Sequence, residues 1–168
     1  ISNAEKEALV KLHKATNGTQ WTNKWDLKAP VESWFGVKIV NDKVVAVNLQ
    51  NNHLSGELPS ELGNLANLQS LNLFKNDISG SIPASIGNLK QLRTLNLAFN
   101  KLTGKLPETL CEASGLVTVE LHMNRISGTL PANIGNLQHL RTFSMYNNEL
   151  TGNIPNSLYN IKSLKSLL

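Results

Sequence analysis

A 24-residue repeat runs through most of this chain and limits what it can fold into. One unit is Leu68–Gln91, LQSLNLFKNDISGSIPASIGNLKQ, and related units lie before and after it without insertion. Three residue types keep the same register: Asn52, Asn76, Asn100, Asn124 and Asn148; Gly56, Gly80, Gly104, Gly128 and Gly152; and Pro59, Pro83, Pro107, Pro131 and Pro155. A sequence period of this length predicts a solenoid, in which each repeat forms one coil and stacks on its neighbours.

Each repeat contains the signals for a short strand followed by a turn. In Leu68–Gln91, the alternation around Leu71 and Leu73 predicts a strand with these leucines pointing inward. Pro83 has the fixed φ that favours the first turn of a short helix. Asn76 follows the strand, and its amide can pair with backbone groups in the turn and in the neighbouring coil. We therefore predict a ladder of structural asparagines, one in each coil.

The segment before the repeats predicts a helix and an aromatic plug. Ser2–Thr16 has apolar residues at helical spacing, Ser2 and Glu5 fit a capping box, and Asn17-Gly18 ends the helix. His13 is expected on the solvated surface of this helix. Three tryptophans follow, Trp21, Trp25 and Trp34. We expect them to form a small core that closes one end of the solenoid, and a sugar-stacking platform is the alternative.

A predicted hairpin connects this cap to the repeats. Phe35–Val40 and Lys43–Leu49 read as strands, and Asn41-Asp42 suits a two-residue turn. The second strand already has the apolar register of the repeats. We expect three parts: an N-terminal cap at 1–43, five repeats at 44–163, and the start of a sixth repeat at 164–168.

Charge and cysteine content argue against several functional classes. A net charge of +4 with 17% charged residues, scattered along the chain, provides no basic stripe for nucleic acid. Cys111 is the single cysteine, so neither an internal disulfide nor a thiolate zinc cluster can form. It is expected to be a small buried side chain. No apolar run reaches the roughly 18 residues needed for a membrane helix, so we predict no membrane insertion by this segment.

No catalytic constellation is evident, and we predict no enzymatic activity, cofactor or metal. The four histidines are dispersed, and each repeated glycine belongs to its coil rather than to a phosphate-binding loop. Glu120 and His122 lie two residues apart on one predicted strand, so an acid–base pair is conceivable. We favour the interpretation that they are two polar residues on one ligand-binding surface.

The repeats resemble leucine-rich repeats of the plant-specific type, with the pattern LxxLxLxxNxLSGxIPxxLGxLxx. The matching residues of two units are Leu92, Leu95, Leu97, Asn100, Leu102, Thr103, Gly104, Leu106 and Pro107, and Leu116, Val119, Leu121, Asn124, Ile126, Ser127, Gly128, Leu130 and Pro131. Residues 1–43 resemble the N-terminal cap of such proteins. Plant receptor caps usually carry paired cysteines, and this cysteine-free cap is more similar to caps of bacterial and protist members.

The resemblance implies both a fold and a mode of action. The expected fold is an α/β solenoid, a right-handed superhelix with a concave parallel sheet, short helical turns on the convex side and a helix–hairpin cap. In this subtype a second short sheet lies near the SGxIP segment. The resemblance also implies binding through the concave or lateral surface, at the cell surface or outside the cell. No signal peptide is present in this chain.

Candidate ligand-binding residues are those that alternate with the inward leucines. The strand register predicts outward columns that include Ala98 and Ser144 as well as several aromatic residues, with arginines at the edge of the patch. The candidates are Asn72, Phe74, Lys75, Arg93, Asn96, Phe99, Glu120, His122, Met123, Arg141 and Tyr146.

Exposed aromatics with arginines at their edge are typical of a binding patch, whereas lateral packing between coils is the structural alternative. The expected partner is a protein or peptide. The alternative partner is an acidic polysaccharide, with Phe74, Phe99 and Tyr146 stacking on sugar rings and with Arg93 and Arg141 pairing with acidic groups.

Overall fold

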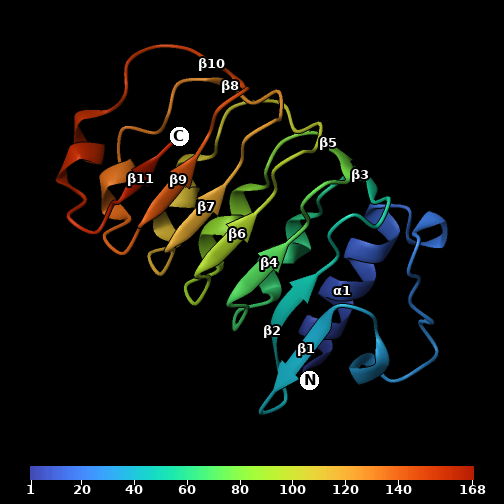
Figure 1. The fold of residues 1–168 in the computed structure, drawn as a ribbon. Helices are drawn as coiled ribbons and strands as arrows, with labels where there is room; N and C mark the ends of the chain where they lie inside the picture. Colours follow the sequence, from blue (N-terminus) through green and yellow to red (C-terminus); the bar gives the residue numbers. More distant parts are fainter.

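The computed structural model describes residues 1–168 and shows a curved solenoid built around one seven-stranded sheet (Figure 1). The sheet order is β1-β2-β4-β6-β7-β9-β11, and every pair except β1–β2 is parallel. The strands are β1 (Val37–Val40), β2 (Lys43–Asn48), β4 (Ser70–Asn72), β6 (Thr94–Asn96), β7 (Thr118–Glu120), β9 (Thr142–Ser144) and β11 (Ser166–Leu167). Neighbouring parallel strands pair residues 24 apart, such as Leu71 with Leu95, so the sequence period becomes the sheet register.

Short helical turns line the side opposite this sheet, as predicted. They are η3 (Ser60–Asn64), η4 (Ala84–Asn88), η5 (Glu108–Glu112), η6 (Ile134–Asn136) and η7 (Asn156–Asn160). Four of them, all except η6, follow a repeat proline directly. Two further two-stranded parallel sheets pair β3 (Ser55–Glu57) with β5 (Asp77–Ser79), and β8 (Ser127–Gly128) with β10 (Glu149–Leu150). The expected second sheet is therefore present in short pieces.

The core is one continuous cluster of 40 buried residues that extends from the cap to the last coil. Its centre is a stack of leucines, valines and isoleucines from equivalent positions of successive coils. Each fully buried aliphatic side chain stabilises the fold by about 1.5–3 kcal/mol. Because every coil is covered by the next, the stability of each repeat depends on its neighbours.

The asparagine ladder has the predicted structural role. The Asn76 amide nitrogen donates to the carbonyls of Leu73 (2.9 Å) and Leu49 (3.0 Å), and its Oδ1 accepts from the backbone N–H of Leu54 (2.9 Å). Asn100 repeats this arrangement one coil later, with bonds to Leu73 and Leu97 carbonyls. Each amide thus satisfies backbone groups of two coils, which would otherwise be buried without partners.

The cap agrees with the prediction in its main elements. Ser2 caps the N-terminus of helix α1 (Asn3–Ala15), and the capping box with Glu5 is present. Asn17 has a left-handed backbone (φ 57°) and leads into η1 (Gly18–Gln20). Asn41 and Asp42 both have positive φ (49° and 64°), as a tight hairpin turn between β1 and β2 requires. No helix in the structure is long and apolar enough to cross a bilayer.

The three tryptophans form the predicted plug. The rings of Trp25 and Trp34 stack at 4.9 Å, and Trp21 meets Trp25 edge-on at 4.8 Å. All three indole N–H groups donate to backbone carbonyls, with distances between 2.7 and 3.0 Å for the shortest bond of each. All three side chains are buried, so they provide packing area rather than an open platform for sugars.

His13 corrects the prediction of a solvated histidine. Its residue is only 7% exposed, and its ring packs edge-on against Trp21 and stacks near Trp25. The first turn after α1 folds back over the helix, so the helix face that seemed free is covered by the plug. The Nδ1 atom of His13 is buried without a hydrogen-bond partner. Burial lowers the pKa of His13 below its ordinary value of 6.5, and the charge of Lys14 adds to this effect.

Cys111 is buried in η5, as expected for a small core side chain. Burial raises the pKa of its thiol to about 11, and nearby Glu108 and Glu112 contribute in the same direction. The thiolate is therefore scarcely populated near neutral pH, which leaves the group unreactive.

Candidate ligand-binding surface

Four aromatic side chains form a continuous row across successive coils of the sheet. Phe74, Phe99, His122 and Tyr146 make up this aromatic row. Phe74 and Phe99 meet edge-on at 5.4 Å, and Phe99 meets His122 edge-on at 5.7 Å. His122 stacks on Tyr146 at 4.5 Å with an interplanar angle of 11°. The row lies just beyond the carboxyl ends of β4, β6, β7 and β9. Phe74, His122 and Tyr146 hold the same register position, and Phe99 comes from the next position of its coil.

Two members of the row remain in contact with solvent. Phe99 is 40% exposed and Tyr146 is 45% exposed, whereas Phe74 and His122 are half-buried by their neighbours. Lateral packing between coils therefore accounts for part of the row, but it leaves two large rings accessible.

Phe99 and Met123 have an unfavourable backbone conformation. Their φ angles are 57° and 60°, in the left-handed region, and Lys75 has φ 57°. The equivalent positions in two other coils hold Asn51 (50°) and Asn147 (54°). Asparagine adopts this conformation more readily than a bulky residue. The scaffold can therefore be built with asparagine here, and the chain instead places an aromatic and a thioether side chain at these positions.

Polar side chains beneath the row fix its geometry. The Asn72 and Asn96 side-chain oxygens each accept from a backbone N–H two residues later, at 3.1 Å. His122 Nδ1 and the Ser144 hydroxyl are hydrogen-bonded at 2.9 Å. The loop after each strand is therefore held in place before any ligand arrives.

Two residues predicted to face outward are buried instead. Ala98 is completely buried, and Ser144 is 2% exposed. Ala98 shares a register column with Phe74 and His122, whose larger rings both contact the ring of the adjacent Phe99. The Ser144 hydroxyl is hydrogen-bonded to the half-buried His122. Strand alternation gives the direction of a side chain, but its size relative to its neighbours decides whether water reaches it.

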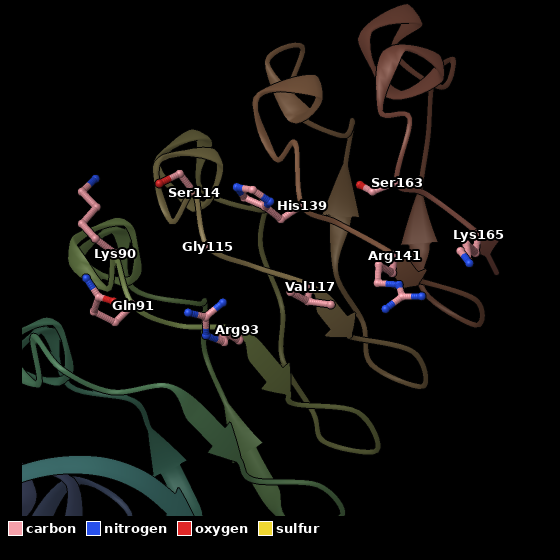
Figure 2. A pocket seen from close by; sticks show the side chains of 10 residues that line it. All are labelled: Lys90, Gln91, Arg93, Ser114, Gly115, Val117, His139, Arg141, Ser163 and Lys165. Carbon is pink, nitrogen blue, oxygen red and sulfur yellow. The ribbon is translucent and has the colours of Figure 1, made fainter. Parts of the chain in front are cut away.

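A second feature is a basic groove of about 700 Å³ near the amino ends of the strands (Figure 2). Its cationic or titratable side chains are Lys90, Arg93, His139, Arg141 and Lys165, and no carboxylate lines it. Figure 2 shows Arg93 on one side of the hollow and Arg141 on the other, with Val117 between them. The basic groove is defined by its ten lining residues: Lys90, Gln91, Arg93, Ser114, Gly115, Val117, His139, Arg141, Ser163 and Lys165.

The structure divides the predicted patch in two. Arg93 precedes β6 and Phe99 follows it, and Arg141 and Tyr146 are related in the same way to β9. The arginines are therefore not at the edge of the aromatic row, because the whole length of the strand separates them. A polysaccharide that stacks on these rings and pairs with these arginines, the alternative from the sequence, would have to extend over the length of a strand.

The remaining candidates lie on the same face in separate positions. Lys75 is exposed and borders a small polar hollow of about 210 Å³ with Asn51, His53 and Asp77. Met123 is half-buried and lies close to Asn147, whose side-chain nitrogen is 2.9 Å from its sulfur. Glu120 on β7 is half-buried, and it makes no hydrogen bond or ion pair with His122. The conceivable acid–base pair does not form.

Sequence reasoning missed several groove residues, namely Lys90, Gln91, Ser114, Gly115, His139 and Ser163. They come from the loop between the helical turn and the strand, where the repeat has no strong pattern. A signal was nevertheless available, since Lys90 and Gln91 precede Arg93 at the same spacing by which Gln138 and His139 precede Arg141.

Comparisons with known proteins agree with this architecture. Two sequence families described as "Leucine Rich repeats (2 copies)" and "Leucine Rich Repeat" match residues 66–111 and residues 43–65, 115–137 and 139–161, which together are more than half of the chain. Polygalacturonase inhibitor 2 of Arabidopsis thaliana is 34% identical over 71 residues, 40% of this chain and 22% of that protein. The chain thus aligns with only about a fifth of the length of this relative.

Solved structures match over a larger part of the chain. The BIR3–SERK2 complex of Arabidopsis thaliana contains a chain that is 30% identical, with a TM-score of 0.78, covering 95% of this chain and 92% of that one. The plant peptide hormone receptor RGFR1 in complex with RGF2 is 38% identical, with a TM-score of 0.70, over 71% of this chain and 19% of that one. The repeat register, the parallel sheet and these matches place the chain in the leucine-rich repeat family.

Proposed function

We propose that this chain is a non-catalytic binding module that recognises a protein or peptide through the concave face of its solenoid. The aromatic row anchors the partner. Exposed, closely spaced aromatic side chains on a rigid surface are the usual centre of a protein interface, because they bury large areas at little entropic cost. The proposed location is outside the cell or at its surface, which the plant receptor and inhibitor relatives support.

One observation carries this proposal: the left-handed backbone of Phe99 and Met123. A non-glycine residue in this region costs roughly 1–2 kcal/mol, and less for asparagine. The coil itself has no need for Phe or Met, because Asn51 and Asn147 occupy equivalent positions in other coils. Strained residues that the surrounding structure holds in place are concentrated at functional sites.

The relatives support a binding role. They include a polygalacturonase inhibitor, the BIR3–SERK2 complex and the plant peptide hormone receptor RGFR1 in complex with RGF2. The short second sheets β3–β5 and β8–β10 support assignment to the plant-specific subtype. The cysteine-free cap supports a separate lineage within it, akin to bacterial or protist members. An acidic polysaccharide is a weaker candidate, since the arginines lie a strand's length from the aromatic rings.

The proposal can be tested by selecting binders from a randomised peptide-display library on the wild-type protein. Dissociation constants of the selected peptides are then compared for the wild type, Phe99→Asn and Tyr146→Ala. We expect each row substitution to weaken binding by about tenfold or more, the effect of losing an interface hot spot. Tyr159→Ala is the matched control, because Tyr159 is 71% exposed but lies in η7, away from the sheet.

Two results would contradict the proposal. The first is that the row variants and Tyr159→Ala bind the selected peptides equally well. The second is that a glycan array yields ligands whose binding requires Phe99 and Tyr146 while peptide selection yields none. Circular dichroism of each variant confirms that the compared proteins are folded.

A further inference from the structure

The positive charges of the basic groove have no acidic partners within the protein. The chain contains two ion pairs, between the N-terminus and Asp42 and between Lys101 and Asp77, and neither involves a groove residue. Lys90 Nζ donates to the Glu112 backbone carbonyl at 2.9 Å, which positions the lysine without neutralising it. Like charges held together by a rigid scaffold repel one another and create a local positive potential. The groove is therefore complementary to a negatively charged group.

The hollow exists because the central coil carries small residues at its lining positions. Val117 occupies the register position held by Gln69, Arg93, Arg141 and Lys165 in the other coils. Gly115 replaces the longer Gln91 and His139 of the neighbouring coils, and an added Cβ would lie 3.0 Å from the Lys90 carbonyl. Arg93 and Arg141 are two coils apart, roughly 10 Å at the spacing of parallel strands. A carboxylate group placed over Val117 can therefore be reached from both sides.

A polar track connects the groove to the aromatic row. The outward residues that begin each strand carry hydroxyl groups, and successive strands pair them directly: Ser70, Thr94, Thr118, Thr142 and Ser166. The next outward residues are Asn72, Asn96 and Glu120. Hydroxyl and amide groups can donate to and accept from the backbone of an extended chain. From Arg93 to Phe99 is six residues, which spans at most about 20 Å of extended backbone.

We propose that the basic groove binds Asp or Glu side chains of the same ligand whose apolar anchor contacts the aromatic row, with the two features five or six residues apart in an extended ligand segment. This inference rests on the function proposed above and adds the ligand's acidic character and spacing. The groove supplies no aromatic surface for a sugar ring apart from His139, and nine of its ten lining residues are polar or glycine, so side-chain carboxylates fit it better than a stacked glycan.

The experiment uses a display library of 16-residue peptides with one fixed tryptophan and all other positions randomised. The peptides are fused through their carboxyl ends, which removes the terminal carboxylate. We expect wild-type protein to enrich Asp or Glu five or six positions from the tryptophan. The enriched peptides are then synthesised with either an amidated or a free carboxyl end. Comparing their affinities distinguishes binding through side-chain carboxylates from binding through the terminal carboxylate. Equal affinity of the two forms supports the proposal, and a requirement for the free end contradicts it.

Four variants locate the effect in the groove. Selection on Arg93→Gln/Arg141→Gln should no longer enrich Asp or Glu. The peptides selected on the wild type should bind this variant about tenfold or more weakly, as expected for the loss of charge-assisted hydrogen bonds. Val117→Glu should act in the same way by supplying a competing carboxylate, whereas Val117→Gln should have little effect, because Gln69 occupies the equivalent position. Lys24→Gln/Lys28→Gln removes the same charge from exposed cap residues and should change nothing.

The outcomes separate this inference from the proposed function. The advantage of tryptophan is measured by replacing it with alanine in the selected peptides. If tryptophan strengthens binding to the wild type and not to Phe99→Asn, but no acidic position is enriched, the groove inference is wrong and the binding module stands. If tryptophan gives no advantage on wild type over Phe99→Asn, the proposed function itself is wrong. Titration with oligogalacturonate forms a third arm. Binding that requires Arg93 and Arg141, without acidic enrichment in the library, assigns the groove to glycans and overturns the proposal.

Discussion

At the scale of single residues, repeated positions build the scaffold and departures from the repeat create the surface. Asn76 and Asn100 hold neighbouring coils together through buried amide bonds. Phe99 shows the opposite behaviour, since it occupies a backbone conformation better suited to asparagine. The two kinds of position respond differently to substitution, and two predictions follow from this difference.

Replacing Asn100 with alanine should destabilise the protein by about 1–3 kcal/mol, because the Leu73 and Leu97 carbonyls and the Ile78 N–H lose buried partners. Urea unfolding followed by circular dichroism measures the change in the free energy of unfolding. Asn88→Ala is the control, since Asn88 is exposed in the preceding coil and its side chain makes no hydrogen bond. Equal effects of the two substitutions would contradict the structural role of the ladder.

Phe99→Asn should leave the free energy of unfolding within about 1 kcal/mol of the wild type. Relief of the left-handed strain is worth roughly 1 kcal/mol, and it offsets the lost contacts with Phe74 and His122, about 0.5–1.5 kcal/mol. Phe99→Ala loses the contacts but keeps the strain, so it should be less stable than Phe99→Asn by about 1 kcal/mol. Urea unfolding compares the two variants, and an alanine variant as stable as the asparagine variant would contradict the strain argument.

At the scale of elements, the cap is held together by packing of α1 against the tryptophan plug. His13 contributes its ring to this packing, and burial favours its neutral form, since Nδ1 has no hydrogen-bond partner. Gly18 lies directly against the ring, and an added Cβ at this position would overlap it. The His13 side chain therefore links the end of α1 to the plug.

The cap should become less stable in mild acid. In the folded protein the pKa of His13 is lowered below 6.5, so the unfolded chain takes up a proton first as the pH falls. Full stability is therefore present above about pH 6.5 and is progressively lost as the pH falls towards the folded pKa. We expect the free energy of unfolding of the wild type to begin to fall as the pH drops below about 6.5, before most carboxylates titrate.

His13→Leu should remove this part of the pH dependence, because leucine fills a similar volume without a titrating group. The measurement is urea unfolding at several pH values, and the slope matters rather than the absolute stability. The other three histidines are common to both proteins and serve as the internal reference. The same slope in both proteins would show that His13 does not cause the acid sensitivity.

At the scale of the whole molecule, cap and coils share one core without a boundary. Helix α1 packs against η3, β2 of the hairpin pairs with β4 of the first full coil, and the buried cluster is continuous. In a short stack of this kind, each interface stabilises both of its coils. Unfolding of one part should therefore expose apolar surface on the next.

We expect the cap and the coils to unfold together. All three tryptophans lie in the cap, so tryptophan fluorescence reports the cap and far-ultraviolet circular dichroism reports the entire chain. The two urea-unfolding curves should coincide, as in a two-state transition. A fluorescence transition at clearly lower urea than the circular dichroism transition would show that the cap is an independent unit.

The sequence by itself determined the solenoid, its register and its buried wall. A strict period with apolar residues at fixed positions leaves one way to bury every coil, and Asn, Gly and Pro meet the backbone needs of each turn locally. The capping box, the hairpin turn and the tryptophan plug were predictable for the same reason, since each depends on residues close together in the chain.

Only the tertiary structure decided which outward-facing side chains are exposed and which contact one another. It buried His13, Ala98 and Ser144 under larger neighbours, and it joined Phe74, Phe99, His122 and Tyr146 into a row. It also separated that row from Arg93 and Arg141 and opened the basic groove over Gly115 and Val117. These properties depend on side chains from three or four coils at once. Solvent exposure and the pairing of charges are set by the sizes and positions of neighbours, which a pattern within one repeat does not specify.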